Sequence, residues 1–258
     1  MRDHRRMVSD SVERFSTRVS NYVRFRPGYP AAIVDLLRRE CDLRAGARIA
    51  DIGSGTGFLS RIFLDAGFFV VGVEPNREMR AAGDEILGEY PNFRSVEGIA
   101  EATTLDDCAY ELIVAGQAFH WFDPPRSRRE WQRILKPDCC AALIWNERTP
   151  RTEVMRAIEE VIDLYSNDHD RSIREGGRSR IADFFAPSEV KTAEFPNRQD
   201  FDFDGVKGRV FSCSYIPNED DPRSRPMVED LKRVFDRYQN GGVIRFEYRT
   251  EVYWGKLT

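Results

Sequence analysis

The sequence has few of the features that mark secreted, membrane-spanning and metal-binding proteins. No apolar run in its 258 residues approaches the roughly 18 needed to cross a bilayer. Residues 1–7 are polar and lack the apolar core of a secretory signal. The five cysteines form no CxxC pair and their number is odd, which argues against a disulfide framework or a zinc site. We therefore expect a cytoplasmic protein without a membrane span and without a bound metal.

Histidine and excess positive charge are also scarce. Of the three histidines, one lies in the polar patch 167–170 beside two aspartates, which we interpret as a polar loop in preference to a metal site. The formal net charge of −4 shows no basic excess of the kind that nucleic-acid-binding proteins carry. The arginines between 126 and 133 have helical spacing and are interpreted as a solvated helix face. We expect no nucleic-acid partner, and the oligomeric state is left open.

The sequence does contain a regular alternation of apolar runs and amphipathic segments. Strands are predicted at 48–52, 68–73, 93–97, 110–114, 139–145, 189–196 and 243–253. Helices are predicted at 8–25, 77–88, 125–135, 152–166, 204–214 and 226–239, with two more around residues 33–37 and 59–64. Strands that alternate with helices imply a parallel sheet with right-handed crossovers. The predicted fold is therefore α/β: a Rossmann-like, seven-stranded, mostly parallel sheet with helices on both faces, an antiparallel C-terminal strand and a helical cap.

A glycine-rich loop follows the first predicted strand. Gly53, Gly55 and Gly57 let the backbone come close to a ligand, and the helix that follows offers free N–H groups. The spacing is GxGxG and not the dinucleotide pattern GxGxxG, because Phe58 occupies the last position. Glu74 lies at the end of the second strand, where a carboxylate can accept both hydroxyls of a ribose. Together these features predict an adenosine ligand; an ordinary tight turn with a surface glutamate is the alternative.

This part of the sequence resembles the cofactor signature of class I S-adenosylmethionine-dependent methyltransferases. The resemblance is carried by residues 51–57 with Glu74, and by 98–101, 117–123 and 22–30. The last two segments are similar to those of the small-molecule branch, which includes ubiquinone- and menaquinone-biosynthesis and trans-aconitate methyltransferases. The resemblance covers about residues 15–147. It implies S-adenosyl-L-methionine as cofactor and a small-molecule methyl acceptor, whose identity and acceptor atom (O, C or N, a carboxylate among them) it leaves open.

The resemblance also implies a role for each matching residue. The cofactor-binding residues would be Tyr22, Arg26, Asp51, Gly53, Gly55, Gly57, Glu74, Pro75, Asn76, Ala100, Glu101 and Gln117. Asp51 would hold the loop and reach the amino group of the cofactor, and Glu74 would bind its ribose. Arg26 is open to two interpretations, as a ligand of the cofactor's carboxylate or an acidic substrate, and as a surface ion pair. Gln117 stands where the family usually has a small residue.

Aromatic residues supply the candidate wall of a substrate pocket that keeps water off the reactive methyl group. These are Phe119, Trp121, Phe122 and Tyr29. His120 is the candidate general base, because an unperturbed imidazole with a pKa of about 6.5 can take a proton from a hydroxyl or carbon acid. The alternative is that His120 packs between its aromatic neighbours and only shapes the pocket.

We interpret residues 1–258 as a single methyltransferase domain with four parts. These are an N-terminal helical entry segment at 1–40, a cofactor-binding core at 41–147, a cap or lid insertion at 148–188, and C-terminal strands and helices at 189–258 that complete the sheet. We expect the helix at 152–166 and the segment 204–215 to close the substrate site, with Gly176–Gly177 as a hinge. A non-catalytic S-adenosylmethionine-binding protein and a nicotinamide-dependent oxidoreductase stay open as alternatives.

Overall fold

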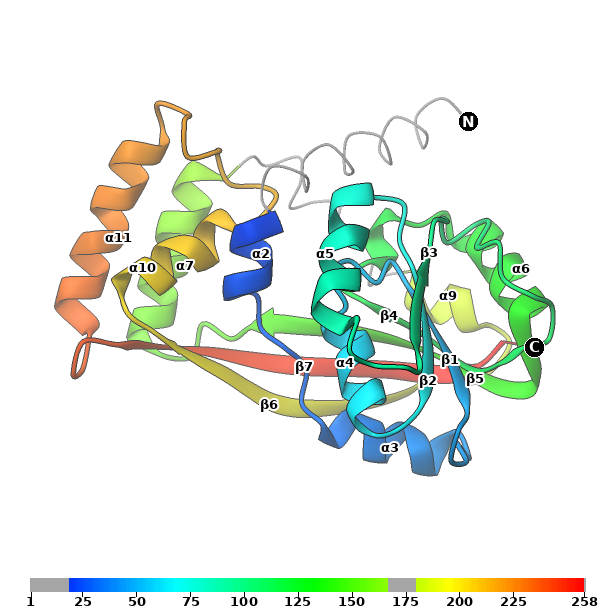
Figure 1. Cartoon of the computed structure of the whole chain (residues 1–258). Coiled ribbons are helices and arrows are strands. Elements are labelled where there is room, and N and C mark those ends of the chain that lie inside the picture. The colour runs from blue at the N-terminus through cyan, green and yellow to red at the C-terminus, as the bar shows by residue number, and fades with distance from the viewer. Residues whose placement is uncertain (1–18, 167–179, 258) are drawn as a thin grey trace.

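The computed structural model describes residues 19–166 and 180–257, which form one seven-stranded sheet with helices on both faces (Figure 1). The strands are β1 (Arg48–Ile52), β2 (Phe69–Val73), β3 (Phe93–Val96), β4 (Tyr110–Gly116), β5 (Leu135–Arg148), β6 (Lys191–Phe201) and β7 (Ile244–Lys256). Their order in the sheet is β3-β2-β1-β4-β5-β7-β6. The pairs among β1 to β5 are parallel, whereas β7 is antiparallel to both of its neighbours. The predicted Rossmann-like fold with an antiparallel C-terminal strand is confirmed.

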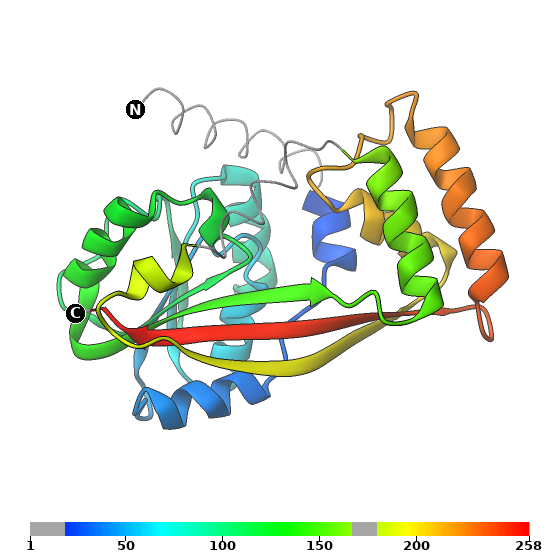
Figure 2. The same cartoon turned by 180° about the vertical axis from the view of Figure 1, so that it is seen from behind.

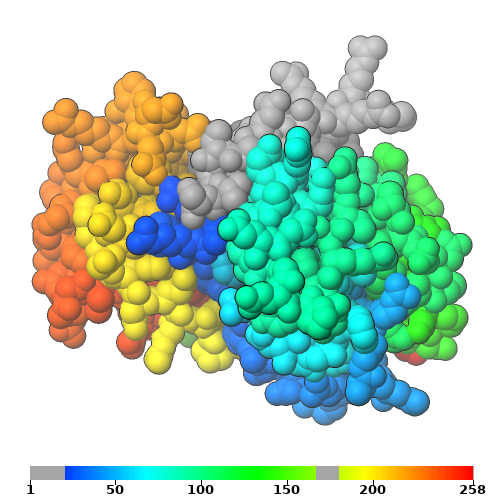
Figure 3. Space-filling model, viewed as in Figure 1, coloured from blue at the N-terminus to red at the C-terminus, as the bar shows by residue number. Residues whose placement is uncertain are grey.

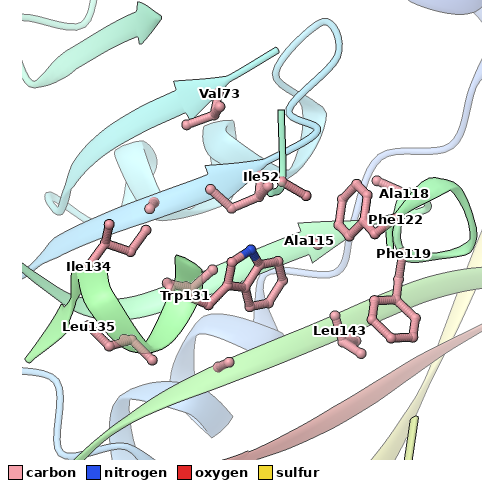
Figure 4. Close-up of a cluster of buried hydrophobic side chains, with 14 of the residues drawn as sticks. Ile52, Val73, Ala115, Ala118, Phe119, Phe122, Trp131, Ile134, Leu135 and Leu143 are labelled. Atoms are coloured by element: carbon pink, nitrogen blue, oxygen red, sulfur yellow. The ribbon is translucent and has the colours of Figure 1, made fainter. Parts of the chain in front are cut away.

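Helices cover the two faces of the sheet because the central strands are apolar on both sides. On one face, α3 (Ala32–Glu40) and α4 (Phe58–Asp65) pack with one residue of α5 (Arg77–Leu87). On the other face lie α6 (Pro124–Ile134) and α9 (Ile181–Phe185), which stand in front of the sheet in Figure 2. Figure 4 shows this second core, where Trp131 of α6 points at the strands and at the aromatic side chains that follow β4. Continuous apolar strands of this kind are typical of parallel sheets buried on both faces.

A second group of helices forms a cap at the far ends of β5, β6 and β7, which extend beyond the other strands (Figure 1). The cap consists of α2 (Val19–Phe25), α7 (Glu153–Tyr165), α10 (Phe203–Phe211) and α11 (Ser224–Tyr238). Their apolar side chains form a cluster of their own with the ends of β6 and β7. On the face shown in Figure 3, α2 lies between α10 and the helices of the core, and it contacts both α10 and α5.

This packing differs from the predicted division of the chain. The cap was expected at 148–188, but α9, within that range, packs into the core through Phe184 and Phe185. The segment 203–216, most of which was expected to close the substrate site, and the helix 224–238, assigned to the part that completes the sheet, supply much of the cap. The predicted loop at 167–180 with its Gly176–Gly177 hinge and the polar patch 167–170 lie almost entirely outside the described residues. The first part of the predicted helix at 8–25 lies outside them too.

Strands β4, β5, β6 and β7 all run past the boundaries that the sequence predicts, and β6 does so through a proline. The strand expected at 189–196 continues to Phe201, through Pro196. Proline cannot donate to a strand ladder, but β6 is the edge strand and needs a partner on one side only. Across the described residues, no helix is both long enough and apolar enough to traverse a bilayer.

Candidate active site

The glycine loop leaves β1 at the carboxyl edge of the sheet, where open α/β sheets bind ligands. Gly53 has a φ of 70°, and its N–H donates to the carbonyl of Val73 at 2.8 Å. A Cβ at this position would lie 2.7 Å from the Cβ of Ala118. Only glycine therefore lets the loop pass this close to the segment that follows β4.

Glu74 is held at the mouth of the loop by backbone groups. One carboxylate oxygen accepts from the N–H of Gly55 and the other from the N–H of Asn76, each at 2.9 Å. Asn76 in turn caps α5, because its Oδ1 accepts from the N–H of Met79. Burial raises the pKa of Glu74, and the two backbone hydrogen bonds oppose that effect. Each oxygen has a second lone pair, so the fixed carboxylate can accept two further hydrogen bonds from a ligand.

Asp51, the next acidic group along the site, is fully buried at the end of β1. Its Oδ2 accepts from the hydroxyl of Ser60 at 2.7 Å, whereas its Oδ1 has no hydrogen-bond partner among the described residues. Burial raises its pKa to about 7, and the hydrogen bond from Ser60 opposes this rise. A buried carboxylate oxygen without a partner is costly, so a ligand that brings an N–H or ammonium donor would be stabilised here.

Two cavities lie at this edge of the sheet. The smaller, of about 100 Å³, is lined by Tyr22, Gly53, Gly55, Glu74, Pro75, Asn76, Met79, Gly98, Ile99, Ala100, Glu101, Gly116, Gln117, Ala118, Trp121 and Phe122. The larger, of about 370 Å³, is lined by Tyr22, Arg26, Pro27, Tyr29, Phe58, Gln117, Trp145, Asn146, Glu147, Arg148, Pro150, Glu159, Ile162, Asp163, Ser166, Arg209 and Tyr215. Tyr22 and Gln117 belong to both walls, so the two cavities adjoin there.

Gln117 stands at this junction in a conformation that non-glycine residues rarely adopt. Its φ is 57°, its N–H donates to the carbonyl of Ile144, and its side-chain amide donates to the carbonyl of Asn146 at 2.8 Å. A residue at positive φ costs on the order of 1 kcal/mol and persists where its surroundings hold it, often at functional sites. The two hydrogen bonds to β5 hold Gln117 in this position.

Most residues predicted for the site line one of the two cavities, but Asp51, Gly57, Phe119 and His120 line neither. Gly57 starts α4 with a φ of 85°, and a Cβ there would lie 2.3 Å from the side chain of Leu87. Gly57 therefore acts on the shape of the loop and its packing against α5. Glu101 lines the smaller cavity and also accepts from the N–H of Asp123 and the hydroxyl of Ser127.

The prediction that Phe119 lines the pocket is wrong. Its side chain is completely buried, and its ring packs in T-shaped contacts on Phe122, Trp145 and Phe184. Figure 4 shows Phe119 and Phe122 in this core. Phe119 belongs to the core because the short 3-10 helix after β4 turns it toward α9. His120 is 9% exposed, lies against Trp121 with 4.8 Å between ring centroids, and is on the wall of neither cavity.

The sequence reasoning also missed several residues that line the cavities. In the smaller cavity these include Met79, Ile99 and Ala118; in the larger they include Asn146, Arg148, Arg209 and Tyr215. Met79 follows the helical spacing of α5 and could have been found from it. The residues of the larger cavity come from β5 and the cap, which no local pattern links to the glycine loop.

The protein family described as a methyltransferase domain matches residues 50–143. This segment, less than half of the chain, is therefore similar to methyltransferase domains. It contains the glycine loop, Glu74 and Gln117, and so accounts for most of the smaller cavity. The cap and the walls that α2, α7 and Arg209 give to the larger cavity lie outside the matched segment.

Similar proteins support the same assignment. An uncharacterized methyltransferase of Mycobacterium tuberculosis is 35% identical over 148 residues, which are 57% of this chain and only 58% of that protein. An uncharacterized methyltransferase-like protein of Schizosaccharomyces pombe is 25% identical over 249 residues, 94% of each chain. A solved structure from Anaeromyxobacter dehalogenans, provisionally classed as a type II methyltransferase, has a TM-score of 0.71 at 19% identity and covers 90% of this chain and 98% of its own. The predicted resemblance to methyltransferases is confirmed, and the last comparison shows a shared fold.

Proposed function

We propose that this chain transfers a methyl group from S-adenosyl-L-methionine to a small-molecule acceptor. The observation that carries this proposal is the pair of adjoining cavities, one built by the methyltransferase domain and the other by the cap, which share Tyr22 and Gln117. A cofactor in the first cavity can thus meet an acceptor in the second. The larger volume, about 370 Å³, falls in the range of cavities that bind small molecules.

The residues of the smaller cavity fit this cofactor. Glu74, on the wall of this cavity, presents a fixed carboxylate to the two ribose hydroxyls. Asp51 is completely buried and lines neither cavity, but its unpartnered Oδ1 suits the ammonium group. Pro75, Asn76 and Ala100 are then the neighbours of the adenine ring. When bound, the cofactor would supply an electrophilic methyl group on a sulfonium.

The chain contributes to the reaction by aligning the two reactants and by excluding water from the site. Walls from α2, α7 and Arg209 enclose the acceptor beside the cofactor site and limit the access of water. Holding the two reactants in line can lower the barrier by about 7–11 kcal/mol. His120, predicted as a general base, lines neither cavity, and methyl transfer to an acceptor that is already deprotonated needs no base.

The experiment that tests this proposal is calorimetric titration with S-adenosylmethionine, S-adenosylhomocysteine and NADH. We expect binding of the first two and not of NADH. Glu74→Ala should weaken binding by at least about 10-fold to 100-fold, because the loss of even one hydrogen bond to a charged group costs about 1.5–3 kcal/mol. Glu97→Ala is the matched control, since its carboxylate follows β3 at the same edge but its side chain is 76% exposed.

Binding of NADH alone would refute the proposal in favour of an oxidoreductase. A screen of acceptors, read out as S-adenosylhomocysteine formed, then separates an enzyme from a non-catalytic binding protein. Cofactor binding without turnover on any acceptor class would favour the non-catalytic alternative.

A further inference from the structure

Three guanidinium groups, those of Arg26, Arg148 and Arg209, line the larger cavity, and so do three carboxylates, those of Glu147, Glu159 and Asp163. Arg148 has a carboxylate partner, because its Nε and Nη2 both donate to Glu159 of α7. The other two have none: within residues 19–166 and 180–257, no carboxylate is hydrogen-bonded to Arg26 or Arg209.

Arg209 is the most deeply placed of the three, with 3% of its surface exposed. Its Nε donates to the hydroxyl of Tyr248 at 2.9 Å, and its Nη1 contacts the hydroxyl of Ser212 at 3.3 Å and the sulfur of Cys213 at 3.2 Å. These partners carry no carboxylate charge. The Cys213 thiol, whose ionised form the guanidinium groups favour, supplies one negative charge to Arg209 and Arg26 together. One of their two positive charges is left without a counter-ion among the described residues, and an anionic ligand can compensate it.

Arg26 reaches the same place from the segment after α2. Its Nη2 donates to the carbonyl of Ser212 at 2.7 Å, and its Nε is buried without a partner among the described residues. The guanidinium lies over the ring of Tyr22, 5.0 Å from its centroid, at the junction of the two cavities. A ligand held by Arg26 and Arg209 would therefore begin close to the cofactor site.

The pKa of the Cys213 thiol reflects the positive charge of the guanidinium groups around it. Burial opposes its ionisation, yet the guanidinium groups of Arg209, Arg26 and Arg148 together lower its pKa to about 5. A group that ionises in a buried position does so only where the surrounding positive charge outweighs desolvation. The same positive charge stabilises an anionic group on a ligand in the cavity.

We propose that the larger cavity binds the methyl acceptor through an anionic group, a carboxylate or a phosphate, held by Arg209 and Arg26. This inference rests on the proposed function, since it names the chemical class of the acceptor. Both arginines line only the larger cavity. Arg209 is nevertheless the discriminating residue, because Arg26 lies over Tyr22 at the junction of the two cavities and could serve the carboxylate of the cofactor instead.

The test is calorimetric titration of the protein loaded with S-adenosylhomocysteine. The probes are succinate, its neutral diamide, and inorganic phosphate, and the two anions distinguish a carboxylate site from a phosphate site. We expect one anion to bind about tenfold or more tightly than the diamide, because a charged acceptor strengthens hydrogen bonds from a guanidinium. Equal affinity for succinate and its diamide with no binding of phosphate, or no binding of either anion, overturns the inference.

Arg209→Gln should weaken the anion about tenfold or more and leave the affinity for S-adenosylhomocysteine unchanged within about threefold. The matched control is Arg225→Gln on α11, whose side chain is 89% exposed. If Arg209→Gln does not fold, Arg209→Lys keeps the charge and should retain the preference for the anion over the diamide, with lower affinity because the planar fork is lost.

Two outcomes separate this inference from the proposed function. If Arg209→Gln weakens the binding of S-adenosylhomocysteine and leaves the binding of the anion unchanged, Arg209 contacts the cofactor. The inference then fails, while the proposed function stands. If the wild type does not bind S-adenosylhomocysteine, the proposed function fails, and the same titrations on the ligand-free protein decide whether the anion site exists.

Discussion

The buried carboxyl group of Asp51 makes the stability of the ligand-free protein depend on pH. Its pKa rises from 3.8 to about 7 on folding, chiefly because burial disfavours the charged form. The folded state therefore keeps a proton that the unfolded chain has released between these two values. As a result, the free energy of unfolding falls as the pH rises through this window. At about 1.4 kcal/mol for each pH unit, the total loss is about 4 kcal/mol.

We expect Asp51→Asn to remove this contribution. The asparagine oxygen can still accept from Ser60, and the amide carries no charge at any pH. The unsatisfied amide hydrogens impose a cost that is the same at every pH, so the informative quantity is the pH dependence. From pH 5 to pH 8, the free energy of unfolding of the variant minus that of the wild type should increase by about 3 kcal/mol.

The assay is urea unfolding of the ligand-free protein at several pH values between 5 and 8, with free energies from linear extrapolation. Asp35→Asn is the control for loss of a carboxyl elsewhere, because the side chain of Asp35 is 79% exposed. A difference between Asp51→Asn and the wild type that stays constant over this range would refute the reasoning, since Asp51 would then be ionised in the folded protein throughout.

Three further predictions concern the cofactor site. If the ammonium of S-adenosylhomocysteine binds ionised Asp51, its affinity in calorimetry should fall about tenfold for each pH unit below 7, and an affinity independent of pH would exclude this contact. Gly53→Ala should lower the free energy of unfolding in urea by about 2–3 kcal/mol and weaken the binding of the cofactor, because Gly53 has a φ of 70° and an added Cβ would meet that of Ala118. Gly28→Ala should have neither effect, because an added Cβ there would have no atom within 4 Å. Phe119→Leu should lower the free energy of unfolding by about 1–2 kcal/mol and leave the affinity for S-adenosylhomocysteine unchanged. A loss of affinity without a loss of stability would show instead that Phe119 lines the cavity.

The cofactor half of the site could be predicted from the sequence because its determinants are local. A glycine loop directly after an apolar strand, and Glu74 directly after the next one, lie together in any parallel sheet whose first two strands are neighbours. The spacing of the apolar residues along the chain likewise predicts the order of strands and helices. These features needed no knowledge of distant contacts.

The acceptor half could not be predicted in this way. Its arginines, at positions 26, 148 and 209, are far apart in the chain. They line one cavity only because β5, β6 and β7 extend beyond the other strands and carry the cap helices at their far ends. Phe119 and Trp121 are both aromatic residues of one short helix, yet one faces the core and the other the cavity. Apolar character alone does not say which way a side chain points in a turn.

The sequence by itself therefore determined the fold class, the glycine loop and the acidic residue that together indicate an adenosine ligand. The tertiary structure alone decided which helices form the cap, that α9 belongs to the core, and that Arg26 and Arg209, which have no carboxylate hydrogen-bonded to them among the described residues, line the same cavity. The physical reason is that hydrophobic packing is not directional. Which apolar cluster a segment joins, and which charges are brought together as a consequence, depends on the whole chain.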